Sequence, residues 1–124
     1  RVAAGVYSAG YSSDPNGMRA RLVVNKEISV LAQDTNPALT VIQGAGPSGA
    51  SAVRCAYLAS GATLAGFTLS NGHTRASGDY TMEQSAGGAY CEPGARLSNC
   101  VSGTISPCTR RAACTGAGCP IASC

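Results

Sequence analysis

The chain repeats part of its own sequence at a constant distance. Residues 56–64 align without a gap on residues 89–97, 33 positions later. Alanine, tyrosine, glycine and leucine recur in register, so that Ala56 matches Ala89 and Leu64 matches Leu97. Such a repeat is typical of stacked units, because each unit can bury its apolar face only against the next one. Function is therefore to be sought where the chain departs from the repeat.

The repeated units are built from short strands. Strands are predicted at residues 21–24, 28–31, 39–42, 53–58 and 62–70, and turns rich in Gly, Pro, Asn and Asp at 14–17, 36–37, 44–47, 71–72 and 93–94. No window has the apolar spacing of an amphipathic helix. The chain is therefore expected to be all-β. A sandwich or barrel would show evenly spaced hairpins, whereas a repeat that keeps its register over so long an offset favours a β-solenoid with one coil enlarged by an inserted loop.

Several phrases of the sequence point to one family. They lie at residues 38–44, 53–58, 61–72, 87–90 (Gly-Gly-Ala-Tyr) and 97–100 (Leu-Ser-Asn-Cys). Together they resemble the right-handed parallel β-helix proteins of the pectin-lyase-like superfamily, in particular the large bacterial secreted or surface repeat proteins. The resemblance covers roughly residues 5–101, with residues 22–44 as opening coils. It implies a right-handed parallel β-helix (solenoid), here a partial domain with few coils, but no particular activity, because this fold hosts lyases, hydrolases and adhesins.

The stacking of coils makes specific residues equivalent. In a parallel stack, equivalent positions of successive repeats lie on one another. Matching inward positions are therefore expected for Leu58 and Cys91, for Leu64 and Leu97, and for Phe67 and Cys100. Cys55 also lies in a strand-like run. Cysteine in such runs is usually a small buried hydrophobe, so these cysteines are assigned to the core.

The expected division of the chain is a set of β-helix coils over residues 1–101 and a cysteine-rich irregular tail over residues 102–124. The tail cysteines, spaced C-x5-C-x4-C-x4-C, lack a typical metal-ligand pattern. Pairing of these cysteines in disulfides, as in secreted proteins, is a second interpretation. A third interpretation is that the tail is frame-shifted and non-native. The possible codons of its residues, read one nucleotide earlier, can encode a sequence close to that of residues 87–100. The chain begins without an apolar leader and shows no capping helix. It is therefore expected to be a mature or excised piece with open end coils.

Catalytic signatures are missing from the sequence, and no catalytic, metal-ligating or cofactor-binding residue is assigned. No two of the six carboxylates are adjacent or at i, i+2, although a polysaccharide hydrolase needs paired acids. Asp14 is assigned to a turn because Pro15-Asn16-Gly17 follows it. His73 is assigned to a turn as well, because no partner for a triad is evident, and the serine and cysteine nucleophiles lack a partner base.

The segment that departs most from the repeat is the polar insertion at residues 73–86. Loops on a rigid scaffold often carry binding residues. Within it Arg75, Asp79, Tyr80 and Glu83 are the candidate ligand-binding residues, since an aromatic face, carboxylates and a guanidinium suit a sugar. A solvated loop held by pairing of Arg75 with Asp79 or Glu83 is the alternative.

These observations lead to a non-catalytic structural or adhesive module of an extracellular or cell-surface bacterial protein, self-associating end to end through open coils. The alternatives are a fragment of a polysaccharide lyase or hydrolase, and a carbohydrate-binding β-helix that uses residues 73–86. The net charge is only +3, and the arginines are scattered, so nucleic acid is not an expected partner. No apolar run reaches membrane-spanning length, so no membrane span is expected either.

Overall fold

A computed structural model describes residues 1–78 and 87–102 of the chain. Apart from one 3₁₀-helix, η1, the regular elements of this part are strands, which confirms the all-β prediction. Asn36 caps η1, because its side-chain oxygen accepts a hydrogen bond from the Ala38 amide at 3.1 Å. The elements are β1 (Gly5–Tyr7), β2 (Ser12–Ser13), β3 (Arg19–Val24), β4 (Ser29–Leu31), η1 (Pro37–Leu39), β5 (Thr40–Gln43), β6 (Val53–Leu58), β7 (Thr63–Ala65), β8 (Thr68–Ser70), β9 (Ala89–Cys91), β10 (Arg96–Ser98) and β11 (Val101–Ser102).

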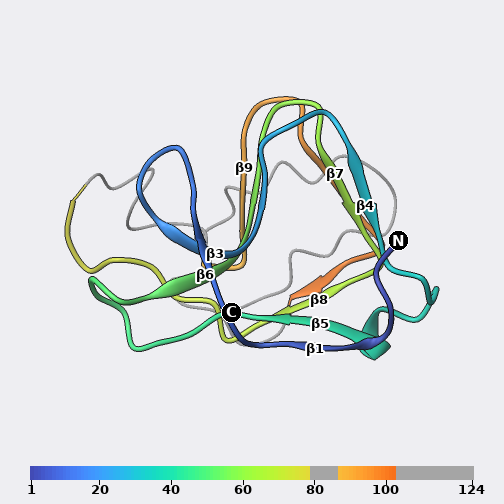
Figure 1. Cartoon of the computed structure of the whole chain (residues 1–124), viewed down its shortest axis with the longest axis horizontal. Coiled ribbons are helices and arrows are strands. Elements are labelled where there is room, and N and C mark those ends of the chain that lie inside the picture. The colour runs from blue at the N-terminus through green and yellow to red at the C-terminus, as the bar shows by residue number, and fades with distance from the viewer. Residues whose placement is uncertain (79–86, 103–124) are drawn as a thin grey trace.

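The strands form three sheets, with strand orders β1-β5-β8-β11, β10-β7-β4 and β2-β3-β6-β9 (Figure 1). Pairing is parallel except between β2 and β3. Strands β6, β7 and β8 pair with strands distant in sequence and not with one another. Residues 53–70 therefore form no antiparallel hairpin among themselves.

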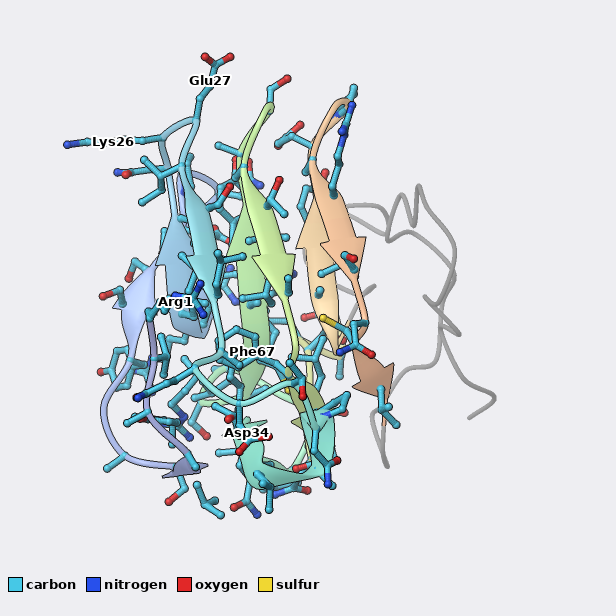
Figure 2. All side chains as sticks on the ribbon, turned by 90° about the vertical axis from the view of Figure 1, so that its right-hand side faces the viewer. Arg1, Lys26, Glu27, Asp34 and Phe67 are labelled. Carbon is cyan, nitrogen blue, oxygen red and sulfur yellow. The ribbon has the colours of Figure 1, made fainter. Side chains whose placement is uncertain are left out.

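From β3 onward, the chain adds one strand to each of the three sheets in a fixed order, and it does so three times. We call β3–β5 the first layer, β6–β8 the second and β9–β11 the third; the layers lie side by side in Figure 2. Leu22 pairs with Ala56, and Ala56 pairs in turn with Ala89, and the two offsets along the chain differ by a single position. The first layer therefore has nearly the repeat length of the second, although its sequence match is weak.

The apolar core lies between the sheets. It is built from inward side chains that stack on their counterparts in the adjacent layers. Leu64 pairs with Val30 on one side and with Leu97 on the other, and Leu58 pairs with Cys91. Phe67 and Cys100 directly precede the paired residues Thr68 and Val101. The six residues of the predicted pairs all belong to one buried cluster, as does Cys55, so the predicted inward positions are confirmed.

The prediction of a single strand over residues 62–70 is wrong. The chain turns between β7 and β8 at Gly66, whose φ of 86° lies in the left-handed region that favours glycine. In the third layer the same corner falls at Asn99, with φ 47°. Asparagine tolerates this backbone better than other side chains do, so Gly66 and Asn99 are equivalent corner residues.

The extra length of the repeat is not confined to the insertion at residues 73–86. The first layer also exceeds a minimal set of three short strands, because residues 32–39 separate β4 from β5 and residues 44–52 separate β5 from β6. As a result Val41 and its partner Thr68 are closer in sequence than the pairs that join the same two layers in the other sheets. The expectation of one enlarged coil is corrected to connections that differ in length from layer to layer.

Residues 2–13 pair with all three sheets at the end of the stack next to the first layer. Val2 forms a parallel bridge with Ala32, β1 lies parallel to β5, and β2 runs antiparallel to β3. This end is therefore not a bare coil, in contrast to the expectation of open end coils. Beyond β1 nothing pairs within the described residues, and β1 is exposed over its length.

Candidate functional site

Of the four candidate ligand-binding residues, the structure describes Arg75 alone; Asp79, Tyr80 and Glu83 lie outside the described residues. The Arg75 guanidinium donates a hydrogen bond from Nη2 to the Gly17 carbonyl at 3.0 Å. Arg75 thereby ties the start of the insertion to a turn far earlier in the chain. The proposed sugar site of residues 73–86 stays a prediction. The cysteine-rich tail after residue 102 likewise lies outside the described residues.

Asp14 is the turn residue that the sequence predicts, and it has a second role. Its Oδ1 accepts hydrogen bonds from the backbone amides of Asn16 and Met18, at 2.8 and 3.0 Å. Its Oδ2 lies 3.6 Å from Nη1 of Arg54, and both side chains are fully buried. A buried ion pair thus joins the turn to β6, an interior strand of the sheet β2-β3-β6-β9. Sequence analysis did not find this pair.

Arg54 projects from the outer face of β6. Burial lowers the pKa of its guanidinium, and the negative charge of Asp14 opposes this shift. The guanidinium also lies 5.0 Å from the ring centroid of Tyr90, in a cation–π arrangement. A buried arginine is costly unless it is paired, so these contacts explain why this position tolerates a charge.

Two stacked tyrosines continue the cluster along the same face. The rings of Tyr57 and Tyr90, paired in register on β6 and β9, lie 5.8 Å apart and 9° from parallel. The Tyr57 hydroxyl donates a hydrogen bond to Oε1 of Glu92 at 3.1 Å. Burial, and next the carboxylate of Glu92, raise the pKa of Tyr57 to about 12. We call Asp14, Arg54, Tyr57, Tyr90 and Glu92 the outer-face cluster.

Two further arginines, both on β3, hold the segment at residues 10–18 against this sheet. Arg21 donates from Nη1 to the Gly10 carbonyl and from Nε to the Gln43 carbonyl. The guanidinium of Arg19 lies 4.5 Å from the ring centroid of Tyr11. Together with the contacts of Asp14, these interactions are internal to the fold. The outer-face cluster therefore fastens the turn to the sheet.

His73 has two neighbours that the sequence did not reveal. Its Nδ1 lies 3.5 Å from Oγ of Ser48, and its Nε2 lies 3.2 Å from Oδ1 of Asn71. The ring also packs on the backbone of Gly46, where an added Cβ would lie 2.6 Å from Nε2. The contact with Ser48 is at the limit of a hydrogen bond, and Ser48 is exposed. We therefore assign His73, Ser48 and Asn71 to holding the loop at residues 44–52 in place.

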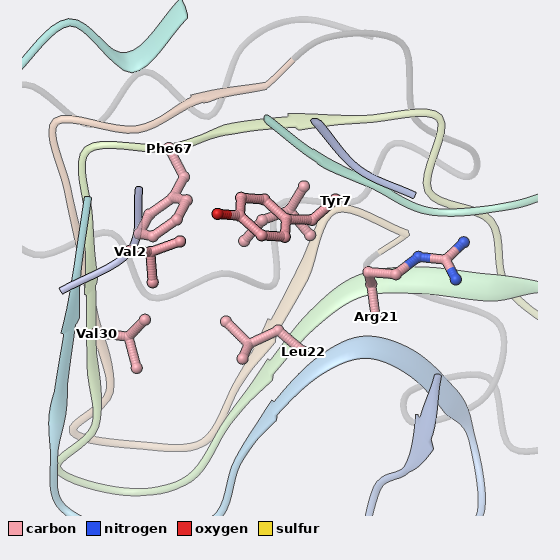
Figure 3. Close-up of a pocket in the computed structure, with 7 residues that line it drawn as sticks. Val2, Tyr7, Arg21, Leu22, Val30 and Phe67 are labelled. Carbon is pink, nitrogen blue, oxygen red and sulfur yellow. The ribbon is translucent and has the colours of Figure 1, made fainter. Parts of the chain in front are cut away.

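A cavity of about 190 Å³, partly open to solvent, lies where the N-terminal residues cross the first layer. Figure 3 shows Val2 and Tyr7 of the N-terminal segment beside Leu22, Val30 and Phe67. The remaining lining residues are Arg21 and Ile42. Sequence analysis did not find this cavity, because it depends on how residues 1–7 cross the first layer.

The chain was compared with family models, curated proteins and solved structures, and none of them matches it. Among the described residues, no three His, Cys, Asp or Glu side chains come together as a metal-binding group would. No helix in the described part of the chain has the length and apolar character needed to cross a membrane.

Proposed function

We propose that the chain is a section of a right-handed parallel β-helix, of the pectin-lyase-like type that its sequence resembles, and that it serves as a structural or adhesive module of an extracellular bacterial protein. The repeated register of the three sheets supports the β-helix. The internal pairing of the outer-face cluster supports a structural role over a catalytic one, because Asp14 and Arg54 form a buried ion pair and Glu92 accepts a hydrogen bond from Tyr57.

We further propose that a second copy of the chain stacks on the first, end to end. The observation that carries this step is the position of two edge strands. In the sheet β1-β5-β8-β11, β1 and β11 are the two edges among the described residues, and pairing within this sheet is parallel throughout. Strand β11 of one copy can therefore add to β1 of the next copy and continue the same sheet. An exposed edge strand is a template for such pairing.

The surface of these strands agrees with this contact. Val6 on β1 is 63 % exposed and Val101 on β11 is 41 % exposed. Association through two different surfaces generates open chains of molecules when the rotation between successive copies does not close a ring, as in a stack extended along its own axis. The module would then act by extending a fibre or a surface layer.

Sedimentation velocity across the micromolar range tests this function. The unchanged chain is expected to show masses that rise with concentration without a limiting oligomer. Val6→Lys and Val101→Lys are each expected to suppress the association, because a lysine at a sheet edge opposes pairing. Leu39→Lys is the matched control, since Leu39 is 47 % exposed on η1 and lies outside the paired residues of β1 and β11. A monomer at every concentration, also after removal of residues 103–124, would refute the proposal.

A further inference from the structure

We infer that the cavity beneath the N-terminal segment is a binding site for a small, neutral, apolar molecule of about the size of benzene. This inference does not rest on the end-to-end stacking, because the cavity lies between the N-terminal segment and the first layer and not outside β1. Its volume, its lining and the direction of its polar groups each support it.

The volume of this pocket, which is partly open to solvent, suits a small ligand. A cavity of about 190 Å³ is smaller than the pockets of roughly 300–1,000 Å³ that hold drug-sized molecules. An apolar cavity of about 150 Å³ engineered into another protein stays dry and binds benzene or xenon. The present cavity is therefore suited to a single ring or a short branched hydrocarbon.

The hollow has a structural origin in the repeat. Thr40 of the first layer precedes Val41, which pairs with Thr68, so Thr40 stands where the second layer has Phe67. The first layer thus lacks the large ring that fills the second. Above it the N-terminal segment contributes Val2 and Tyr7 to the lining. Leu22 and Val30 are consequently half-buried, whereas their partners Ala56 and Leu64 are fully buried.

The polar groups of the lining are engaged elsewhere. The Tyr7 hydroxyl donates to the Ala3 carbonyl at 2.7 Å, and the Arg21 guanidinium donates to the carbonyls of Gln43 and Gly10. Figure 3 shows that this guanidinium points away from the other lining side chains, so Arg21 offers its aliphatic stem. A bound water needs two to four polar partners. The lining therefore favours a neutral apolar ligand over water or an anion.

Methyl NMR of the full chain, titrated with benzene, tests the inference. Saturable shifts are expected for the methyl groups of Val2, Leu22, Val30 and Ile42, and not for those of Leu39. Benzoate is expected to bind at least tenfold more weakly than benzene, because its charge would lose solvation without gaining a partner.

Cavity-filling variants identify the site. Leu22→Phe is expected to weaken benzene binding at least tenfold, and Leu39→Phe, which adds the same ring at an exposed position, is expected to leave it unchanged. Val30→Leu adds a single carbon and is expected to weaken binding several-fold, so it serves if Leu22→Phe does not fold. Shifts that do not saturate, or that survive in the folded filling variants, would overturn the inference. So would lining methyl shifts that follow protein concentration without benzene, since a second copy would then occupy the cavity.

Discussion

Truncation of Leu64 measures how strongly the layers depend on one another. Leu64 is completely buried on β7 and pairs with Val30 and Leu97 in the adjacent layers. Leu64→Ala removes three carbon atoms, for which the transfer term at about 0.8 kcal/mol each is roughly 2.4 kcal/mol. The layers on both sides limit relaxation into the space left behind, so a cavity term adds to this. The expected loss of unfolding free energy is about 3–4 kcal/mol, within the range for buried leucines.

Equilibrium unfolding in urea, followed by far-UV circular dichroism, provides the measurement. The transition midpoint of Leu64→Ala is expected to fall while the slope stays constant, because the area exposed on unfolding hardly changes. Leu39→Ala is the matched control, with an expected cost below about 1 kcal/mol at its exposed site. Equal effects of the two truncations would refute the stacked core, because Leu64 would then not be held between layers.

The remaining predictions concern the outer-face cluster, the corner and the tail. Arg54→Met is expected to cost about 3–5 kcal/mol in urea unfolding by leaving the buried Asp14 carboxylate without its partner, and adding Asp14→Asn should recover part of the loss; a strictly additive double variant would contradict the pairing. The pKa of Tyr57 is raised from 10 to about 12, so stability is expected to be fully present below pH 10 and to fall as pH rises from 10 to 12, with a smaller fall in Tyr57→Phe; identical pH profiles would count against this. Asn99→Ala is expected to cost roughly 1–2 kcal/mol through its positive φ and the loss of its hydrogen bond to Thr35, whereas Asn99→Gly should cost less in the same unfolding assay. Deleting residues 108–124 is expected to leave the unfolding midpoint nearly unchanged, and a loss as large as that of Leu64→Ala would indicate structural disulfides in the tail.

The stacked inward positions were predictable because the same pattern of residues occurs twice in the sequence, at 56–64 and at 89–97. Leu64 and Leu97 recur at the same spacing as Tyr57 and Tyr90, and parallel pairing places each on its counterpart. The corner at Gly66 was not predicted, because Phe67 and Leu69 alternate as they would in one continuous strand. Only the equivalence of Gly66 with Asn99, two residue types that accept positive φ, could have indicated the turn.

The outer-face cluster was not predictable, because it joins residues that no periodicity relates. Arg54 and Asp14 are far apart in the sequence and belong to different kinds of segment, one to a strand of the repeat and the other to a turn before it. Their contact depends on the antiparallel pairing of β2 with β3, which turns the chain back at residues 14–17. The sequence did contain one signal, namely a charged residue inside an otherwise apolar run at 53–58.

The same reversal explains why one end of the stack differs from its middle. A strand antiparallel to β3 cannot pass on the parallel register that β3, β6 and β9 share, so the repeat cannot continue through this sheet beyond β2. The sheet that ends in β1 keeps its parallel register to the edge. Of these two sheets, the one that ends in β1 is therefore the one that can be extended at this end with its register kept. The arginines that hold residues 10–18 in place also determine which sheet stays available to a neighbouring molecule.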